Sequence, residues 1–264
     1  MQGKKFISPG NWFSMVYPAA WSEFEDSEGT FLFYNPDVWT GNFRISAFKG
    51  APGYGDDAAR RELKENPSAT QVQAGAWLCA YSKETFCEQG KYYVAHLWVT
   101  GKGDVAFECS FTVSKGESPR EGEAVVASLE VRHEGQPYPA EVIPLRLSEM
   151  YAIDEHCNRL ASLLKKELKK EFQGEEEDLP ALQQLLEKGG LNLSKPADLE
   201  MLGVALCAVF ANEVEGAEWK TLVAGRREAP VLQYRGNTID PLTLCPADGK
   251  PCNVEEIYRN LAGE

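Results

Sequence analysis

The sequence predicts an α+β protein of two domains, with antiparallel strands in the first half and helices in the second. Up to about residue 113, apolar and polar residues alternate in short runs, which is the period of half-buried strands. From about residue 148 onward, apolar residues recur at helical spacing. A proline-bearing stretch separates the two patterns, so we expect a domain over 1–135, a linker over 136–147 and a second domain over 148–264.

The first half is predicted to open on a strand ending at Pro18, which has no N–H to donate to a ladder. Phe13, Met15 and Tyr17 share one face of this strand because side chains alternate. Further strands are expected over 30–34, 42–48, 70–74, 76–86, 91–100 and 104–113, with one helix capped by Asp56 and another from Pro119 to about Arg132. Meandering strands with covering helices predict an antiparallel sandwich.

The second half is predicted to be mainly helical, with one small β-hairpin. Ser148 is the expected cap of a long helix ending near Gly174, and Asn253 is the expected cap of the last helix. The remaining elements are helices over 179–188 and 196–213 and a hairpin pairing 219–224 with 231–234.

Composition limits the partners. The formal net charge is −13 and the pI is about 4.9, so nucleic acid would on average be repelled and a basic partner is favoured. No apolar run reaches the length of a membrane span, and none follows Lys4 and Lys5 as in a signal peptide. We therefore expect a cytoplasmic protein with no membrane partner, provided that residue 1 is the natural start.

Seven scattered cysteines predict reduced thiols rather than a disulfide framework. No Cys-x-x-Cys pair occurs, so no metal site is expected. Cys245 and Cys252 have six residues between them and could pair if the compartment is oxidising. His156 and Cys157 are adjacent on a predicted helix and point about 100° apart, which argues against a catalytic pair. The glycine-rich loop 50–55 lacks the lysine of a phosphate loop, and no cofactor is expected.

The segment Phe13-Ser-Met-Val-Tyr-Pro-Ala-Ala-Trp21, followed by Phe31–Pro36 and Phe43–Phe48, resembles the opening strands of the PsbP-like superfamily. That superfamily includes an extrinsic photosystem subunit, a Ran-binding import factor and bacterial lipoprotein relatives. The second half, marked by Leu202-Gly203, Trp219 and Ile239-Asp240-Pro241, resembles an uncharacterised companion domain of bacterial proteins. The resemblance implies binding or scaffolding and supplies no substrate and no site residues.

Three residues are candidates for binding. Trp39 lies in a loop with little core character and could form an exposed recognition patch with Tyr54, although a covered loop residue is the simpler interpretation. Asp240 follows a strand, where it would either contact a ligand or make an Asx-type turn.

These observations favour a non-catalytic protein that binds a protein or peptide, in the manner of a chaperone, adaptor or immunity protein. The alternative is an enzyme with a small-molecule pocket at the domain interface. No nucleophile, metal or phosphate motif supports the alternative. A periplasmic or surface lipoprotein-like module is not expected, because no signal segment is seen, unless the true start lies upstream.

Overall fold

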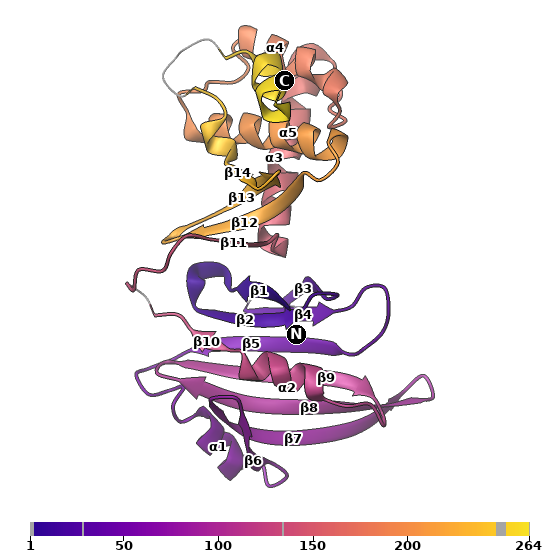
Figure 1. Cartoon of the computed structure of the whole chain (residues 1–264), viewed down its shortest axis with the longest axis vertical. Helices are drawn as coiled ribbons and strands as arrows, with labels where there is room; N and C mark the ends of the chain where they lie inside the picture. The colour runs from indigo at the N-terminus through magenta and orange to yellow at the C-terminus, as the bar shows by residue number, and fades with distance from the viewer. Residues whose placement is uncertain (1–2, 28, 134, 247–251, 264) are drawn as a thin grey trace. The chain divides into compact units, whose positions relative to one another are not determined.

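Two compact units make up the chain, Met1–Pro137 and Tyr138–Glu264 (Figure 1). The structure is a computed structural model that describes residues 3–27, 29–133, 135–246 and 252–263. Strands dominate the first unit and helices the second, which confirms the α+β prediction. Among the described residues, no helix combines the length and the apolar character needed to cross a membrane.

The first unit contains a seven-stranded and a three-stranded antiparallel sheet. The larger sheet has the order β3 (Ser22–Ser27), β4 (Thr30–Tyr34), β5 (Asn42–Lys49), β9 (Val105–Ser114), β8 (Lys91–Lys102), β7 (Trp77–Glu88) and β6 (Thr70–Ala74). The smaller has the order β1 (Gly3–Ile7), β2 (Phe13–Pro18) and β10 (Glu130–Val131). β1 and β3 were not predicted from the sequence, because each is short, lies at a sheet edge and carries charged side chains.

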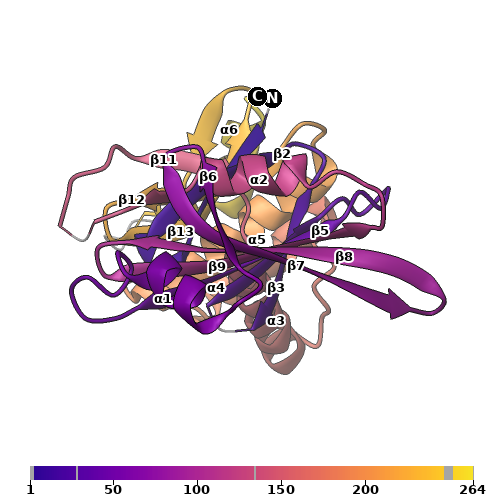
Figure 2. The same ribbon diagram turned by 90° about the horizontal axis from the view of Figure 1, so that it is seen from below.

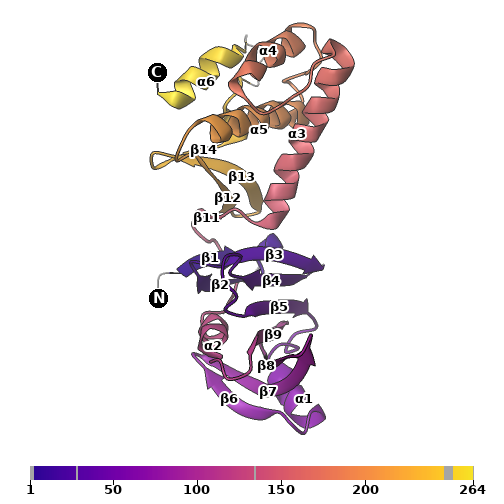
Figure 3. The same cartoon turned by 90° about the vertical axis from the view of Figure 1, so that its right-hand side faces the viewer.

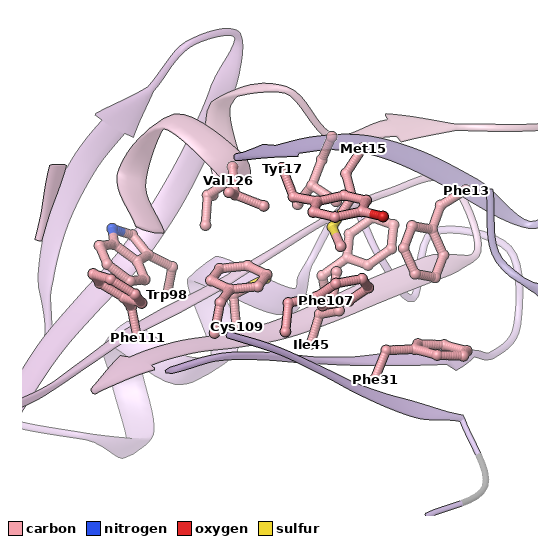
Figure 4. Packing of buried hydrophobic residues seen from close by; sticks show 14 of the residues in the cluster. Phe13, Met15, Tyr17, Phe31, Ile45, Trp98, Phe107, Cys109, Phe111 and Val126 are labelled. Carbon is pink, nitrogen blue, oxygen red and sulfur yellow. The ribbon is translucent and has the colours of Figure 1, made fainter. Parts of the chain in front are cut away.

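Aromatic side chains fill the core of the first unit (Figure 4). Phe13, Met15 and Tyr17 of β2 are buried, as their alternation predicts. Trp21 is also buried, and its ring stacks on Phe111 with centroids 5.6 Å apart. Since each large aromatic ring removes much apolar surface from water, these contacts are the main stabilising term of the sandwich.

Two short helices lie on opposite sides of the long strands (Figure 3). α2 (Arg120–Ala127) contacts β2, β6 and β9, whereas α1 (Ala58–Glu65) contacts β7 and β8. The predicted cap of α1 is wrong: Asp56 Oδ1 accepts a hydrogen bond from Gly103 N at 2.8 Å instead. α2 ends earlier than predicted, because Ser128 bonds back to Val125 O and the chain then pairs with β2 as β10.

The second unit contains a four-stranded sheet where the sequence predicted only a hairpin. The order is β11 (Glu141–Pro144), β12 (Glu218–Ala224), β13 (Arg227–Tyr234) and β14 (Asn237–Ile239), all antiparallel. β11 falls inside the stretch 136–147 that was expected to be a linker. A four-residue edge strand ending in proline has too short an alternation to stand out in the sequence.

The helices of this unit are α3 (Leu147–Leu168), α4 (Leu179–Glu187), α5 (Pro196–Glu213) and α6 (Val254–Ala262). α5 is buried on most sides and is the central core helix. Ser148 does not cap α3, since the helix already begins at Leu147. The helix ends at Leu168, before the predicted Gly174, because Lys169 adopts a left-handed conformation with φ 58°. Asn253 caps α6 as predicted, its side chain accepting from Glu256 N at 3.1 Å.

A buried ion network joins the start of α3 to the sheet. Arg146 is 1% exposed, and its guanidinium donates to both carboxylate oxygens of Glu149 at 2.7 and 2.6 Å and to Glu228 at 2.6 Å. The hydroxyl of Thr221 accepts from Arg146 N and donates to Glu149, at 3.0 and 3.1 Å. Each buried charge therefore has an opposite charge and hydrogen-bond partners, which is the condition for tolerating its desolvation.

Two of the three sequence markers of the second half, Leu202-Gly203 and Ile239-Asp240-Pro241, meet in space. Gly203 lies inside α5, where an added Cβ would collide with the carbonyl oxygen of Pro241 and lie 2.7 Å from its carbonyl carbon. Pro241 opens the short 3-10 helix η3 (Pro241–Thr243), directly after Asp240. The absence of a side chain at Gly203 thus lets the backbone of η3 lie directly on α5.

Candidate functional site

An open cavity of about 570 Å³ lies on the outer face of the seven-stranded sheet, at the end away from α1. We call it the Trp39 cavity. Its aromatic walls are Trp39 from the β4–β5 loop and Phe86 and Tyr93 from the β7–β8 hairpin. β7 and β8 run out past their neighbours at this end (Figure 2). The hairpin and the loop therefore present aromatic rings that are not covered by the core.

Tyr93 contacts both of the other rings, and all three remain partly open to solvent. Phe86 and Tyr93 are cross-strand partners that stack at 5.6 Å, and Trp39 meets Tyr93 edge-on at 6.3 Å. Trp39 is 50% exposed and Phe86 is 37% exposed. Large aromatic side chains held half-exposed beside a cavity are typical of recognition surfaces.

The floor of the Trp39 cavity is polar. Asn42 and Arg44 of β5 lie beside their register partners Thr112 and Ser110 of β9, all with side chains on the outer face. Glu88 stands at the hairpin end of the cavity, opposite Lys91 across the turn. The cavity thus offers hydroxyl, amide, guanidinium and carboxylate groups under an aromatic wall, which suits an elongated ligand with both polar and apolar parts.

A local turn fixes the loop that carries Trp39. Asn35 Oδ1 accepts hydrogen bonds from the backbone N–H groups of Asp37 and Val38 at 3.0 and 3.3 Å, which is an Asx-type turn. The chain then rejoins the sheet at Asn42, the first residue of β5. The turn restrains the loop ahead of Trp39 and so limits the conformations that a ligand would have to select.

Tyr54 lies elsewhere. Its ring packs over Gly50, where an added Cβ would collide with it, and the guanidinium of Arg61 lies over the ring at 4.3 Å. Arg61 also donates to Tyr54 O at 3.1 Å. Tyr54 is not among the residues that line the Trp39 cavity. The structure therefore does not bring the predicted pair together, and a binding role for Tyr54 stays a prediction.

Asp240 has two protein partners. Its Oδ1 accepts from Leu242 N at 3.1 Å and from an Arg227 guanidinium nitrogen at 2.7 Å, while Oδ2 bonds the other nitrogen. The hydrogen bonds from Arg227 are the main reason that the pKa of Asp240 is lowered from its ordinary value of 3.8. Both carboxylate oxygens thus hold the turn between β14 and η3 against β13.

This ion pair predicts an acid-dependent loss of stability. Because the pKa of Asp240 is lower in the folded chain, its contribution is complete above its ordinary value and is lost as pH falls below it. Replacing Arg227 with glutamine should lower the free energy of unfolding by about 1 kcal/mol at pH 7, with a smaller loss at pH 3. Urea titrations at both pH values measure this difference. An equal loss at both would contradict the assignment, and Arg226→Gln is the neighbouring control.

The surroundings of Cys157, His156 and His96 are those of packed side chains rather than of a catalytic pair. Burial raises the pKa of the Cys157 thiol to about 11, so it is protonated at neutral pH. His156 Nδ1 is buried and has no hydrogen-bond partner among the described residues. His96 shares a hydrogen bond of 2.7 Å with the Tyr81 hydroxyl, and burial lowers its pKa. Within the described ranges, no group of three or more His, Cys, Asp or Glu is placed to hold a metal ion.

Trp39 was predicted from the sequence as a candidate, but the rest of the cavity was not. Phe86, Tyr93 and Arg44 lie within predicted strands, and nothing local to each marks it as a site residue. The alternation of side chains along a strand could have identified them. It places each on the face opposite the buried residues, where an aromatic ring or an arginine contacts either solvent or a partner. The register that joins β5, β9 and β8 was needed to place them beside one another.

Comparison with known proteins identifies both halves. A domain of unknown function, DUF3805, matches residues 1–154, which is more than half of the chain. The chain belongs to the DUF3805 family. A second domain of unknown function, DUF3806, matches residues 178–258. The prediction of two uncharacterised domains is thereby confirmed, and no curated protein matches the chain.

Solved structures extend the comparison. A crystal structure of a protein from Bacteroides thetaiotaomicron VPI-5482 is 59% identical, with a TM-score of 0.94 over 99% of each chain. Two further structures match about half of this DUF3805 chain. Cyanobacterial PsbP from Synechocystis is 12% identical, covering 49% of this chain and 92% of its own, with a TM-score of 0.29.

The other is LpqN, involved in cell envelope biogenesis of Mycobacterium tuberculosis, which is 13% identical, covering 50% and 91%, with a TM-score of 0.31.

Proposed function

We propose that the chain is a non-catalytic binding protein that holds a basic, extended segment of a partner protein in the Trp39 cavity. The single observation that carries the proposal is the half-exposed aromatic wall of Trp39, Phe86 and Tyr93 beside a polar sheet face. Within this class, a chaperone, adaptor or immunity-type role fits a protein that masks such a segment. The proposed compartment is the cytoplasm, which suits the scattered cysteines.

The aromatic wall supports a cationic side chain as the anchor. A lysine or arginine placed over the ring of Trp39 or Tyr93 is attracted by the negative face of the ring. Glu88 at the hairpin end supplies a carboxylate for the same group, at a position where it faces solvent when no ligand is present. The net charge of −13 attracts a basic segment at longer range and speeds its encounter with the chain.

The floor supports the rest of the segment. The hydroxyls of Ser110 and Thr112 and the amide of Asn42 can exchange hydrogen bonds with the backbone of an extended peptide. The guanidinium of Arg44 can donate to its carbonyl oxygens, because it is an obligatory donor. The peptide backbone thus contacts the polar sheet face, which contributes affinity. One side chain of the peptide contacts the aromatic wall, which contributes specificity.

The test uses the full chain and short fluorescent peptides in matched pairs, one rich in lysine and arginine and one with glutamate at those positions. We expect the basic peptides to bind and Trp39→Ala to weaken that binding about tenfold, through loss of the cation–π contact and ring burial. Fluorescence anisotropy at low and high salt measures the affinity. Glu88→Gln should weaken binding severalfold, with a smaller effect at high salt.

Val38→Ala is the matched control, because Val38 is 62% exposed beside Trp39 but does not line the cavity. It should leave binding unchanged. Equal losses in the two alanine variants, equal binding of basic and acidic peptides, or no binding of any peptide would each overturn the proposal.

A further inference from the structure

We propose that Cys245 and Cys252 form a dithiol oxidation site, which small-molecule disulfides convert reversibly into an intramolecular disulfide. The two residues flank the segment 246–251, and both are free thiols in the structure. This site lies in the second unit and is independent of the Trp39 cavity. Its evidence is the contact between the two thiols, their unequal exposure and the elements to which they are attached.

The thiols are already in contact. The thiols of Cys245 and Cys252 share a hydrogen bond, and both side chains belong to one apolar cluster. This bond lowers the pKa of Cys252 from its ordinary value and raises that of Cys245. Cys252 is therefore the thiol that more readily becomes a thiolate, and the thiolate is the reactive form.

The exposure of the two thiols also indicates that Cys252 reacts first. Cys252 is half-buried, so a small disulfide can reach it, whereas Cys245 is only 4% exposed. A third thiol, Cys207 of α5, lies close enough to Cys245 to contribute to its raised pKa. Cys207 itself is fully buried, and burial raises the pKa of its thiol. Cys252 is thus the attacking residue and Cys245 the resolving one.

The exchange proceeds in two balanced steps. The Cys252 thiolate, having released its proton to water, attacks one sulfur of a disulfide such as oxidised glutathione and expels one glutathione thiolate. The Cys245 thiol then releases its proton, and its sulfur attacks Cys252 Sγ and expels the second thiolate. Two protein thiols are oxidised to one disulfide, and one glutathione disulfide is reduced to two thiols.

The position of the two cysteines means that a disulfide between them would join two elements of the second unit. Cys252 directly precedes Asn253, the cap of α6, and Cys245 follows η3, which lies on α5. α6 enters the core through Val254 and Tyr258, which are 0% and 7% exposed. The disulfide would therefore fasten the start of α6 to the turn that follows η3.

The experiment treats the folded full-length protein with mixtures of reduced and oxidised glutathione, blocks free thiols with iodoacetamide and digests with trypsin. Residues 236–259 form one tryptic peptide, because Lys250 precedes a proline, and it contains these two cysteines alone. We expect this peptide to lose the mass of two hydrogen atoms and to escape alkylation. The melting temperature should rise by about 5 °C on oxidation and return with dithiothreitol.

Cys87→Ser is the matched control, because Cys87 is exposed and separate from the pair; it should leave the disulfide unchanged. Cys252→Ser should leave Cys245 fully alkylated after denaturation. Glutathione retained on Cys252, a disulfide to any other cysteine, or oxidation that requires denaturant would overturn the proposal.

Discussion

Replacing Gly203 with alanine is expected to lower the free energy of unfolding by about 3 kcal/mol. An added methyl group would meet the backbone of Pro241, which cannot rotate away as a side chain could. Either α5 or η3 must shift, although alanine itself favours helix over glycine by about 1 kcal/mol. Calorimetry of the full chain measures the loss, and hydrogen exchange should locate it in α5 and η3 rather than in the first unit.

The control for this variant is Gly216→Ala. Gly216 has a φ of +84° with open space around its Cα, so alanine there tests backbone conformation without a collision. We expect a loss of about 1 kcal/mol. If Gly203→Ala were stabilising, or no worse than Gly216→Ala, the close approach of η3 to α5 would be contradicted.

The second large effect is expected at Arg146. Replacing it with methionine keeps an apolar stem but leaves Glu149 and Glu228 without their shared cation. Removing one partner of a buried ion network typically destabilises by about 3–5 kcal/mol, because the remaining charge stays desolvated. Urea unfolding followed by circular dichroism measures the change.

A triple variant, Arg146→Met with Glu149→Leu and Glu228→Gln, separates charge from packing. Since the uncompensated carboxylates are gone, most of the lost stability should return. Arg146→Lys should recover only part of it, because an ammonium group cannot bond both carboxylate oxygens in the fixed geometry of a guanidinium. A triple variant as unstable as Arg146→Met would show that the shape of the side chain matters more than its charge.

Elements with a strong period could be predicted from the sequence. β4 and α5 were predicted with their observed bounds, since one is a short aromatic run ended by Asn35-Pro36 and the other carries recurring apolar residues from Pro196 to Glu213. Short edge strands such as β1 and β11 were not, because pairing on one side requires only a few residues and little apolar character. The cap predicted at Asp56 failed because a distant partner, Gly103 N, takes its side chain, and the one predicted at Ser148 failed because α3 already begins at Leu147.

The candidate site was predictable only in its loop. Trp39 could be singled out because a tryptophan between Asn-Pro-Asp and Thr-Gly has no period to bury it. Arg44, Phe86 and Tyr93 come from three different strands, and only the register of the sheet sets them around one cavity. The pairing of strands that are distant in the sequence leaves no local pattern, so composition and periodicity cannot predict which residues become neighbours.

The uneven distribution of tryptophans between the two units allows intrinsic fluorescence to follow each unit. Five tryptophans fall in the first unit and Trp219 alone in the second, where it packs against the core. Intrinsic emission therefore describes mostly the sandwich, and Trp219→Phe would make it describe the sandwich entirely. The difference between the two spectra isolates the light from a single fluorophore in the helical half, so each half can be followed separately with no attached dye.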